Sequence, residues 1–216
     1  MALCGLINSD LLINCANPLV GGVRDLLYII NYDDLSDYTK DLDGVVTNIS
    51  LLAGKSGYYY EGQKSSIEIK SSLQAAKYAF GFNHDIVFRV FSNDAATKTQ
   101  LEALSRGKFI VIVENNFKGA GDASSFEVYG LDSGLKIISN ESNKSDGDTQ
   151  GAWVLNIATG DIKEPFLPRF IFSSSYADTK TLIEGLLIPP TIPTNATLGE
   201  DGQPILNEDG NFILNE

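Results

Sequence analysis

The sequence predicts a mainly β protein with one α-helix and an extended C-terminal arm. The 216 residues include 20 glycines, 9 tyrosines and 11 phenylalanines. Aromatic residues favour strands, and glycine favours the turns between them. Short apolar or alternating segments recur between turn-forming residues, whereas one stretch alone, residues 95–106, combines helical spacing with helix end signals.

The composition is that of a folded chain with one domain and a tail. Hydrophobic residues make up 43% and charged residues 20%, which is enough to bury a sizeable core. We expect one domain over residues 1–188. Pro189, Pro190 and Pro193 interrupt regular structure, and we therefore expect an extended acidic arm over residues 189–216.

The first third of the chain contains three expected strands and an acidic loop. The apolar residues 23–30 follow the Gly21-Gly22 turn and predict a strand. Residues 31–44 contain five aspartates and predict a solvated loop, and residues 45–53 predict a second strand. Apolar and small residues at every second position from Ile67 to Leu73 predict one face of a further strand.

The middle of the chain predicts a strand, a helix and a buried strand. Residues 86–91 are rich in valine, isoleucine and phenylalanine. Ser92, Asn93 and Asp94 are candidates to cap a helix over residues 95–106 that ends at Gly107. The short apolar run of residues 108–114 predicts a buried strand.

The last part of the domain is predicted from turns and short apolar segments. Residues 126–129 and 135–138 predict a hairpin with a five-residue loop at 130–134. Residues 179–188 are compatible with either a helix or a strand. Residues 140–150 predict a long polar loop and residues 152–157 a further strand. Pro165 and Pro168 bound a segment that precedes residues 170–172.

Phosphate-binding and dinucleotide-binding motifs are incomplete. A phosphate-binding loop ending in Gly54-Lys55-Ser56 needs a glycine at position 49, which is Ile49. The glycines at 119 and 121 follow a strand as a dinucleotide motif requires, but the third position is Ser124 and a strand follows. We therefore expect no cofactor.

Metal and catalytic motifs are also missing. A calcium loop at residues 146–157 has Ile157 where a glutamate is required. His84, the one histidine, stands beside Asp85, and adjacent strand residues point to opposite faces. We therefore expect neither a metal site nor a catalytic residue, and hence not an enzyme. No apolar run reaches membrane-helix length, and we expect no contact with a membrane.

The arm contains an eight-residue repeat. Residues 200–207 (EDGQPILN) and 208–215 (EDGNFILN) share six identities. Each unit is too short to bury its own apolar residues, and two outcomes stay open: contact with a neighbouring subunit, or a disordered tail. The residues expected to make the inter-subunit contact are Ile205, Leu206, Phe212, Ile213 and Leu214.

Several short motifs occur in the order typical of one viral family. They are Cys4-Gly-Leu, Asn14-Cys15, the segment 21–28, Ser71-Ser72-Leu73, the strand through Phe91, the helix to Gly107, the strand 108–114, the segment 126–130 and Gly134-Leu135. Over about residues 1–160 the chain thus resembles the tail tube-like structural proteins of tailed bacteriophages that infect Bacteroidetes-type bacteria. The repeat after Pro189 lies outside that pattern and leaves open a specialised ring or connector protein.

The resemblance implies a β-sandwich or barrel-like domain with a flanking helix. It also implies a virion structural protein of the tail or head–tail junction, assembled in the host cytoplasm. Such subunits form a homo-oligomeric ring, a hexamer or a multiple of one, and stack on neighbouring tail or connector proteins. Viral DNA passes through the lumen without specific binding. The net charge of −12 is compatible with this role, because acidic residues facing a lumen repel the phosphate backbone.

A second class of function stays open on the sequence. An independent β-sandwich module that binds a carbohydrate or a receptor could use exposed aromatic rings as stacking surfaces. The candidate rings are Tyr58, Tyr59, Tyr60 and Trp153. The competing interpretation of these aromatic residues is packing within strands.

Overall fold

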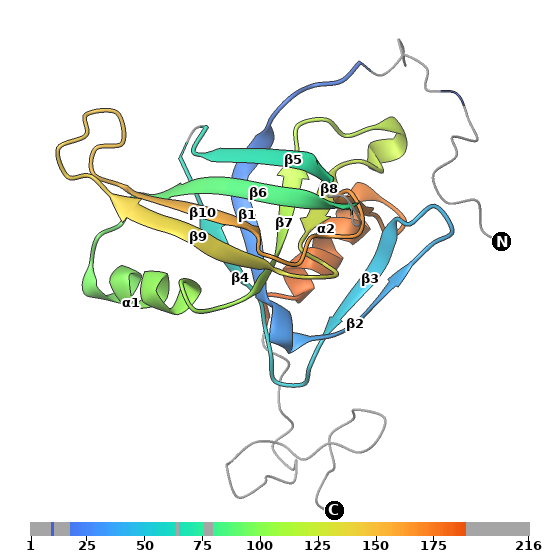
Figure 1. Ribbon diagram of the computed structural model, residues 1–216. Helices are drawn as coiled ribbons and strands as arrows, with labels where there is room; N and C mark the ends of the chain where they lie inside the picture. The colour runs from blue at the N-terminus through green and yellow to red at the C-terminus, as the bar shows by residue number, and fades with distance from the viewer. Residues whose placement is uncertain (1–9, 11–17, 64, 76–79, 189–216) are drawn as a thin grey trace, which may run out of the picture.

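The computed structural model describes residues 10, 18–63, 65–75 and 80–188, which form a mainly β domain (Figure 1). The predicted fold class is confirmed. The strands are β1 (Val23–Asn31), β2 (Leu35–Lys40), β3 (Val46–Leu51), β4 (Tyr58–Glu61), β5 (Ile67–Ala75), β6 (Phe80–Val90), β7 (Phe109–Asn115), β8 (Phe126–Tyr129), β9 (Leu135–Ser142), β10 (Trp153–Thr159) and β11 (Arg169–Ile171). The helices are α1 (Ala95–Leu104) and α2 (Tyr176–Gly185), with short 3-10 turns at Tyr32–Asp34 and Ala120–Asp122.

The strands form a mixed sheet that divides into two layers. Its order is β2-β3-β11-β8-β7-β9-β10-β6-β5, and β1 pairs with both β7 and β4. Pairing is antiparallel except between β11 and β3. The single Phe109–Leu135 pair joins β7 to β9, and the layer β9-β10-β6-β5 lies across β1 and β7 (Figure 1). We call it the four-stranded layer.

Strands β1 and β7 are covered on both faces. One core cluster lies between them and the four-stranded layer, and the other lies on the side of α2. This double cover explains the continuous apolar runs, and the expected buried strand at 108–114 is confirmed as β7. Each fully buried aliphatic side chain contributes about 1.5–3 kcal/mol. Leu27, Ile29, Val111 and Val113 face the first cluster, and Tyr28, Ile30, Ile110 and Ile112 face the second.

The helices begin at capped positions. Asp94 accepts a hydrogen bond from the backbone N–H of Thr97 at 2.7 Å, which confirms one of the three expected caps of α1. Ser175 caps α2 by accepting from the N–H of Asp178 at 3.1 Å. The segment left open between helix and strand is therefore mostly helical, because Ile183 packs in the second core cluster. The domain has two helices, one more than expected.

The prediction of a loop over residues 31–44 is wrong. A 3-10 turn and strand β2 occupy most of it, and β2 pairs with β3. Leu35 and Tyr38 pack against the second core cluster while Asp37 stays exposed. A strand at the end of a sheet can keep its acidic residues in solvent, and acidic composition alone therefore does not exclude a strand.

The predicted hairpin between residues 126 and 138 is also wrong. Both strands exist, but β8 pairs with β7 and β11, whereas β9 pairs mainly with β10. Residues 130–134 carry the chain from one layer to the other. Gly130 has φ +72, and a Cβ there would lie 2.5 Å from Cγ of the buried Leu135. The crossing thus depends on a left-handed glycine in close contact with the core.

Substituting Gly130 tests this crossing. We expect Gly130→Ala to lower the free energy of unfolding by about 2 kcal/mol, since the new methyl group meets both backbone strain and Leu135. Chemical denaturation measures the change. The matched control is Gly147→Ala, where no heavy atom lies within 4 Å of the added carbon. Equal stability of the two variants would contradict the assignment.

Candidate functional site

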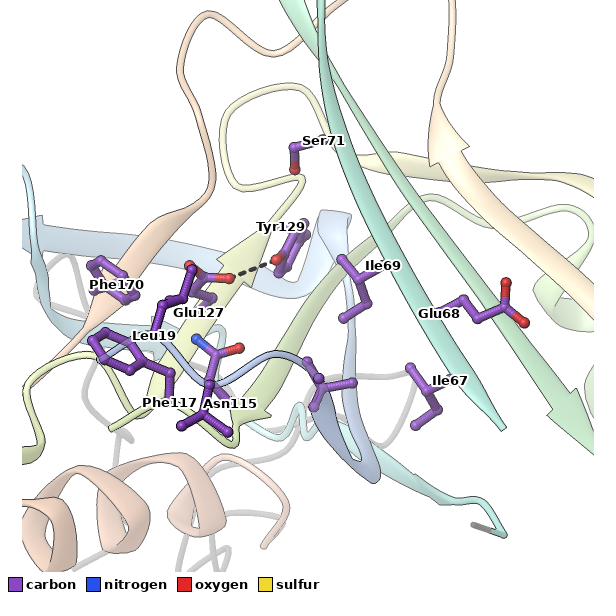
Figure 2. Close-up of a pocket in the computed structure, with 13 residues that line it drawn as sticks. Leu19, Ile67, Glu68, Ile69, Ser71, Asn115, Phe117, Glu127, Tyr129 and Phe170 are labelled. Carbon is purple, nitrogen blue, oxygen red and sulfur yellow. Dashed lines mark hydrogen bonds between the residues drawn. The ribbon is translucent and has the colours of Figure 1, made fainter. Parts of the chain in front are cut away.

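An open groove lies between the inward face of β5 and strand β8 (Figure 2). Its volume is about 540 Å³. Ile67 and Ile69 project into it because they alternate along β5, and the carboxylate of Glu68 lies on the other side of the strand. The other apolar side chains of the lining are Leu19, Val20, Val23, Phe117 and Phe170.

The polar groups of the groove are engaged with one another. The Tyr129 hydroxyl donates to Oε2 of Glu127 at 2.6 Å. Burial, together with the adjacent Glu127 carboxylate, raises the pKa of Tyr129 above its usual value. Glu68 forms an ion pair with Arg89 at 2.8 Å. The groove therefore offers a largely apolar contact surface. Its charged lining residues are Glu68 and Glu127, and no histidine or cysteine is among its described lining residues.

His84 is a buried structural side chain. Its Nδ1 accepts from the backbone N–H of Gly130 at 3.3 Å, and its Nε2–H donates to the carbonyl of Phe166 at 3.1 Å. The ring packs edge-on against Tyr129. Burial lowers the pKa of His84 to about 4. Both ring nitrogens have backbone partners, and Asp85 projects from the opposite face of β6 as the alternation predicts.

Glu164 is a second buried group that holds the 130–134 crossing. Its carboxylate accepts from the backbone N–H groups of Asp132 at 3.2 Å and of Ser133 at 2.8 Å. Tyr38 donates to the Asp132 carboxylate at 2.9 Å. Burial raises the pKa of Glu164. Together with His84, these contacts fix the turn between the two layers.

Glu114 is the third buried ionisable group. It lies at the end of β7, with its side chain 2% exposed. Arg24 lies 3.1 Å and Lys118 2.5 Å from its Oε1, and Tyr176 donates to the same oxygen at 2.9 Å. The carboxylate thus links β1, α2 and the loop after β7. No sequence motif indicated it.

Two further features are absent from the described residues, a metal-binding cluster and a membrane-spanning helix. These residues contain no group of three or more histidine, cysteine, aspartate or glutamate side chains arranged to hold a metal ion. Asp146 instead accepts from Asp148 N–H at 2.9 Å and from the Thr149 hydroxyl at 2.8 Å within its own loop. None of the described helices has both the length and the apolar character needed to cross a bilayer.

The outer face of the four-stranded layer is polar and balanced in charge. The strand register aligns four residues in one row across β5, β6, β10 and β9. In order, they are Lys70, Asp85, Ala158 and Lys136. Arg89 forms an ion pair with Glu68. It also lies opposite Val154 of β10, which in turn lies opposite Glu141 of β9. The charged residues of this face are Glu68, Lys70, Asp85, Arg89, Lys136 and Glu141.

Exposed apolar side chains occur on the segment 160–168, at the start of β6 and in the β2–β3 turn. Phe82 and Glu164 exchange backbone hydrogen bonds at 2.7 and 3.1 Å. Lys40 Nζ lies 5.6 Å and Arg169 4.1 Å from the Phe166 ring centre. We call this set the end patch, because exposed apolar clusters mark interaction surfaces. Its members are Leu42, Phe80, Ile162, Phe166 and Leu167.

The candidate stacking aromatics do not form one platform. Tyr60 packs on Phe88 with ring centres 5.0 Å apart, in the first core cluster. Tyr58 and Tyr59 are exposed, but adjacent residues of β4 project to opposite faces. Trp153 packs partly against the core and donates to Asn93 at 3.2 Å. Tyr60 and Trp153 therefore serve packing.

The predicted contact residues of the arm lie outside the described residues. They are Ile205, Leu206, Phe212, Ile213 and Leu214. Comparison with protein-family models, curated proteins and solved structures gives no match.

Proposed function

We propose that the chain is a bacteriophage virion structural protein that oligomerises into a ring or tube, part of the DNA-conducting tail or head–tail channel. The observation that carries the proposal is the open edge of β5. This strand has nine residues and pairs only with β6 among the described strands. A strand of this length with a free edge is a template for pairing with another chain.

The four-stranded layer is suited to form the wall of such a channel. Pairing through β5 would continue the layer into the next subunit, and head-to-tail contacts between identical subunits close into a ring where the rotation permits. The other side of the layer is occupied near α1, where Asn140 donates to Ser105 at 3.1 Å. The balanced charge of the outer face offers no concentration of lysine and arginine to retain DNA.

Contacts along the axis would use different surfaces. The end patch provides apolar side chains beside Lys40 and Arg169, and a chain with a net charge of −12 offers acidic partners to these cations. The apolar residues of the C-terminal repeat would contact the adjacent ring or a neighbouring tail or connector protein. The interior would accommodate DNA, and the end patch and arm would join successive rings.

A lysine on β5 tests the ring. Mass photometry of the wild-type protein should give particles of six subunits or a multiple of six. Leu73, 60% exposed on β5, should be essential for pairing, and Leu73→Lys should give mainly monomers, because lysine on an edge strand opposes pairing with another strand. Circular dichroism checks that the variant is folded.

The matched control is Ile138→Lys. Ile138 is 57% exposed on β9, so this variant loses a similar apolar side chain and gains the same charge away from β5. It should retain the wild-type assemblies. A wild-type protein that stays monomeric at high concentration and binds a sugar saturably would overturn the ring and favour the independent binding module.

A further inference from the structure

We propose that residues 1–17 fill the groove between β5 and β8 of their own chain. Of this segment the structure describes Asp10 alone. The groove belongs to the inward face of β5, so its occupation leaves the hydrogen-bonding edge of β5 available to another subunit. The inference is therefore independent of the ring.

The chain enters the described domain at the groove itself. Leu19 and Val20 line it, and they are 82% and 54% exposed. Figure 2 shows Leu19 beside Phe117, facing Ile69 across the groove. Two large apolar side chains at the rim are thus left uncovered by the described residues. The described chain resumes at residue 18, directly before the groove residues Leu19 and Val20, so residues 1–17 need no long connection to reach the groove.

The chemistry of the segment matches that of the groove. Residues 1–17 contain one acidic and no basic residue. Burying apolar side chains in an apolar groove is favourable by about 25 cal/mol per Å² of area removed from water. The large aliphatic residues of the segment are Leu3, Leu6, Ile7, Leu11, Leu12 and Ile13.

The other segment outside the described domain fits less well. Residues 189–216 contain five acidic and no basic residues, and the charged residues that line the groove, Glu68 and Glu127, are also acidic. Like charges oppose docking there. The described chain also ends after α2, which packs in the second core cluster, whereas the groove borders the first through Ile67 and Tyr129. Charge and attachment both favour residues 1–17.

Docking within one chain has an entropic advantage over docking between chains. A short tether gives an attached segment a millimolar effective concentration at its site. A second copy would have to exceed that concentration to compete. Occupation should therefore be independent of protein concentration, which separates this proposal from an exchange of segments between subunits.

The test is the reactivity of a thiol placed in the groove of the full-length chain. Ser71 lines the groove, and Ser72 projects from the opposite face of β5. The thiols introduced by Ser71→Cys and Ser72→Cys are treated with a maleimide, and peptide mapping by mass spectrometry follows each site separately from the native cysteines. Each cysteine variant is measured alone and with serine at Leu11, Leu12 and Ile13. The control triple replaces Ile205, Leu206 and Ile213 with serine instead.

We expect the Leu11, Leu12 and Ile13 substitutions to speed modification of the Ser71→Cys thiol about tenfold, as for a segment docked about nine-tenths of the time. The control triple and the Ser72→Cys thiol should show no change, at any protein concentration. An unchanged rate at Ser71→Cys would overturn the proposal. So would a response to the control triple, or protection that disappears on dilution. None of these results depends on whether rings form.

Discussion

Acidification from about pH 6.5 to about pH 4 should remove about 3 kcal/mol of folding stability through His84 alone. The folded state keeps this ring neutral down to about 4, whereas an unfolded histidine titrates near 6.5. Between these values the unfolded state binds more protons, so acid favours unfolding. The contribution is complete above about 6.5 and is lost as the pH falls to about 4.

The main cause of the lowered pKa is burial of the ring. The geometry adds a second reason, because a protonated ring has no acceptor at Nδ1. That nitrogen accepts from the Gly130 N–H, and a proton there would place two donors against each other in a buried site. The same contact holds the crossing between the layers, so protonation should loosen residues 130–134 first. Hydrogen exchange of these amides should rise before the global transition.

Urea denaturation across this pH range, in wild type and in His84→Gln, measures the effect. The variant should be less stable at pH 7, and its stability should change less between pH 6.5 and 4. Glu164 has a raised pKa and works in the opposite direction, because its folded state retains a proton more readily. That contribution is common to both proteins. Parallel pH profiles would show that His84 does not titrate as described.

The sequence predicted most strands because their signals are local. The apolar run of β7, the alternation of β5 at Ile67 and Ile69 and the cap at Asp94 each occupy a few consecutive residues. Which strands pair with one another was harder to predict from the sequence. The predicted hairpin between β8 and β9 was wrong because a five-residue turn is compatible both with a hairpin and with a crossing between layers. The contact that fixes the crossing, between His84 and Gly130, joins residues 46 positions apart.

The buried polar groups escaped prediction for the same reason. Glu114 ends the apolar run that was predicted as a buried strand, but two of its partners, Arg24 and Tyr176, come from distant segments. Nothing near Glu164 distinguishes it from the many exposed acidic residues. Only one wall of the groove could be predicted from the sequence, from the alternation of apolar residues in β5. The facing wall, with Phe117 and Phe170, required the pairing of β7, β8 and β11.

Lys118→Ala should destabilise the domain by about 3 kcal/mol, although most substitutions of surface lysines change stability little. Its ammonium lies 2.5 Å from the Glu114 carboxylate, whose side chain is 2% exposed. Removing one partner of a buried pair leaves a desolvated charge with fewer compensating groups, which typically costs about 3–5 kcal/mol. We expect the low end because Arg24 and Tyr176 still bind the carboxylate. Chemical denaturation at pH 7 gives the value.

A double-mutant cycle with Glu114→Gln separates this effect from other losses. In that background Lys118→Ala leaves no unpaired buried charge. It should then cost about 1 kcal/mol, from loss of the cation–π contact between the Lys118 ammonium and the Tyr176 ring, whose centre is 5.0 Å away. Lys55→Ala is the surface control: its ion pair with Asp34 at 3.4 Å is half exposed on the lysine side, and its loss should cost at most about 1 kcal/mol. Equal costs of Lys118→Ala in both backgrounds would mean that Glu114 does not depend on Lys118. The difference between them is the coupling free energy of Glu114 with Lys118.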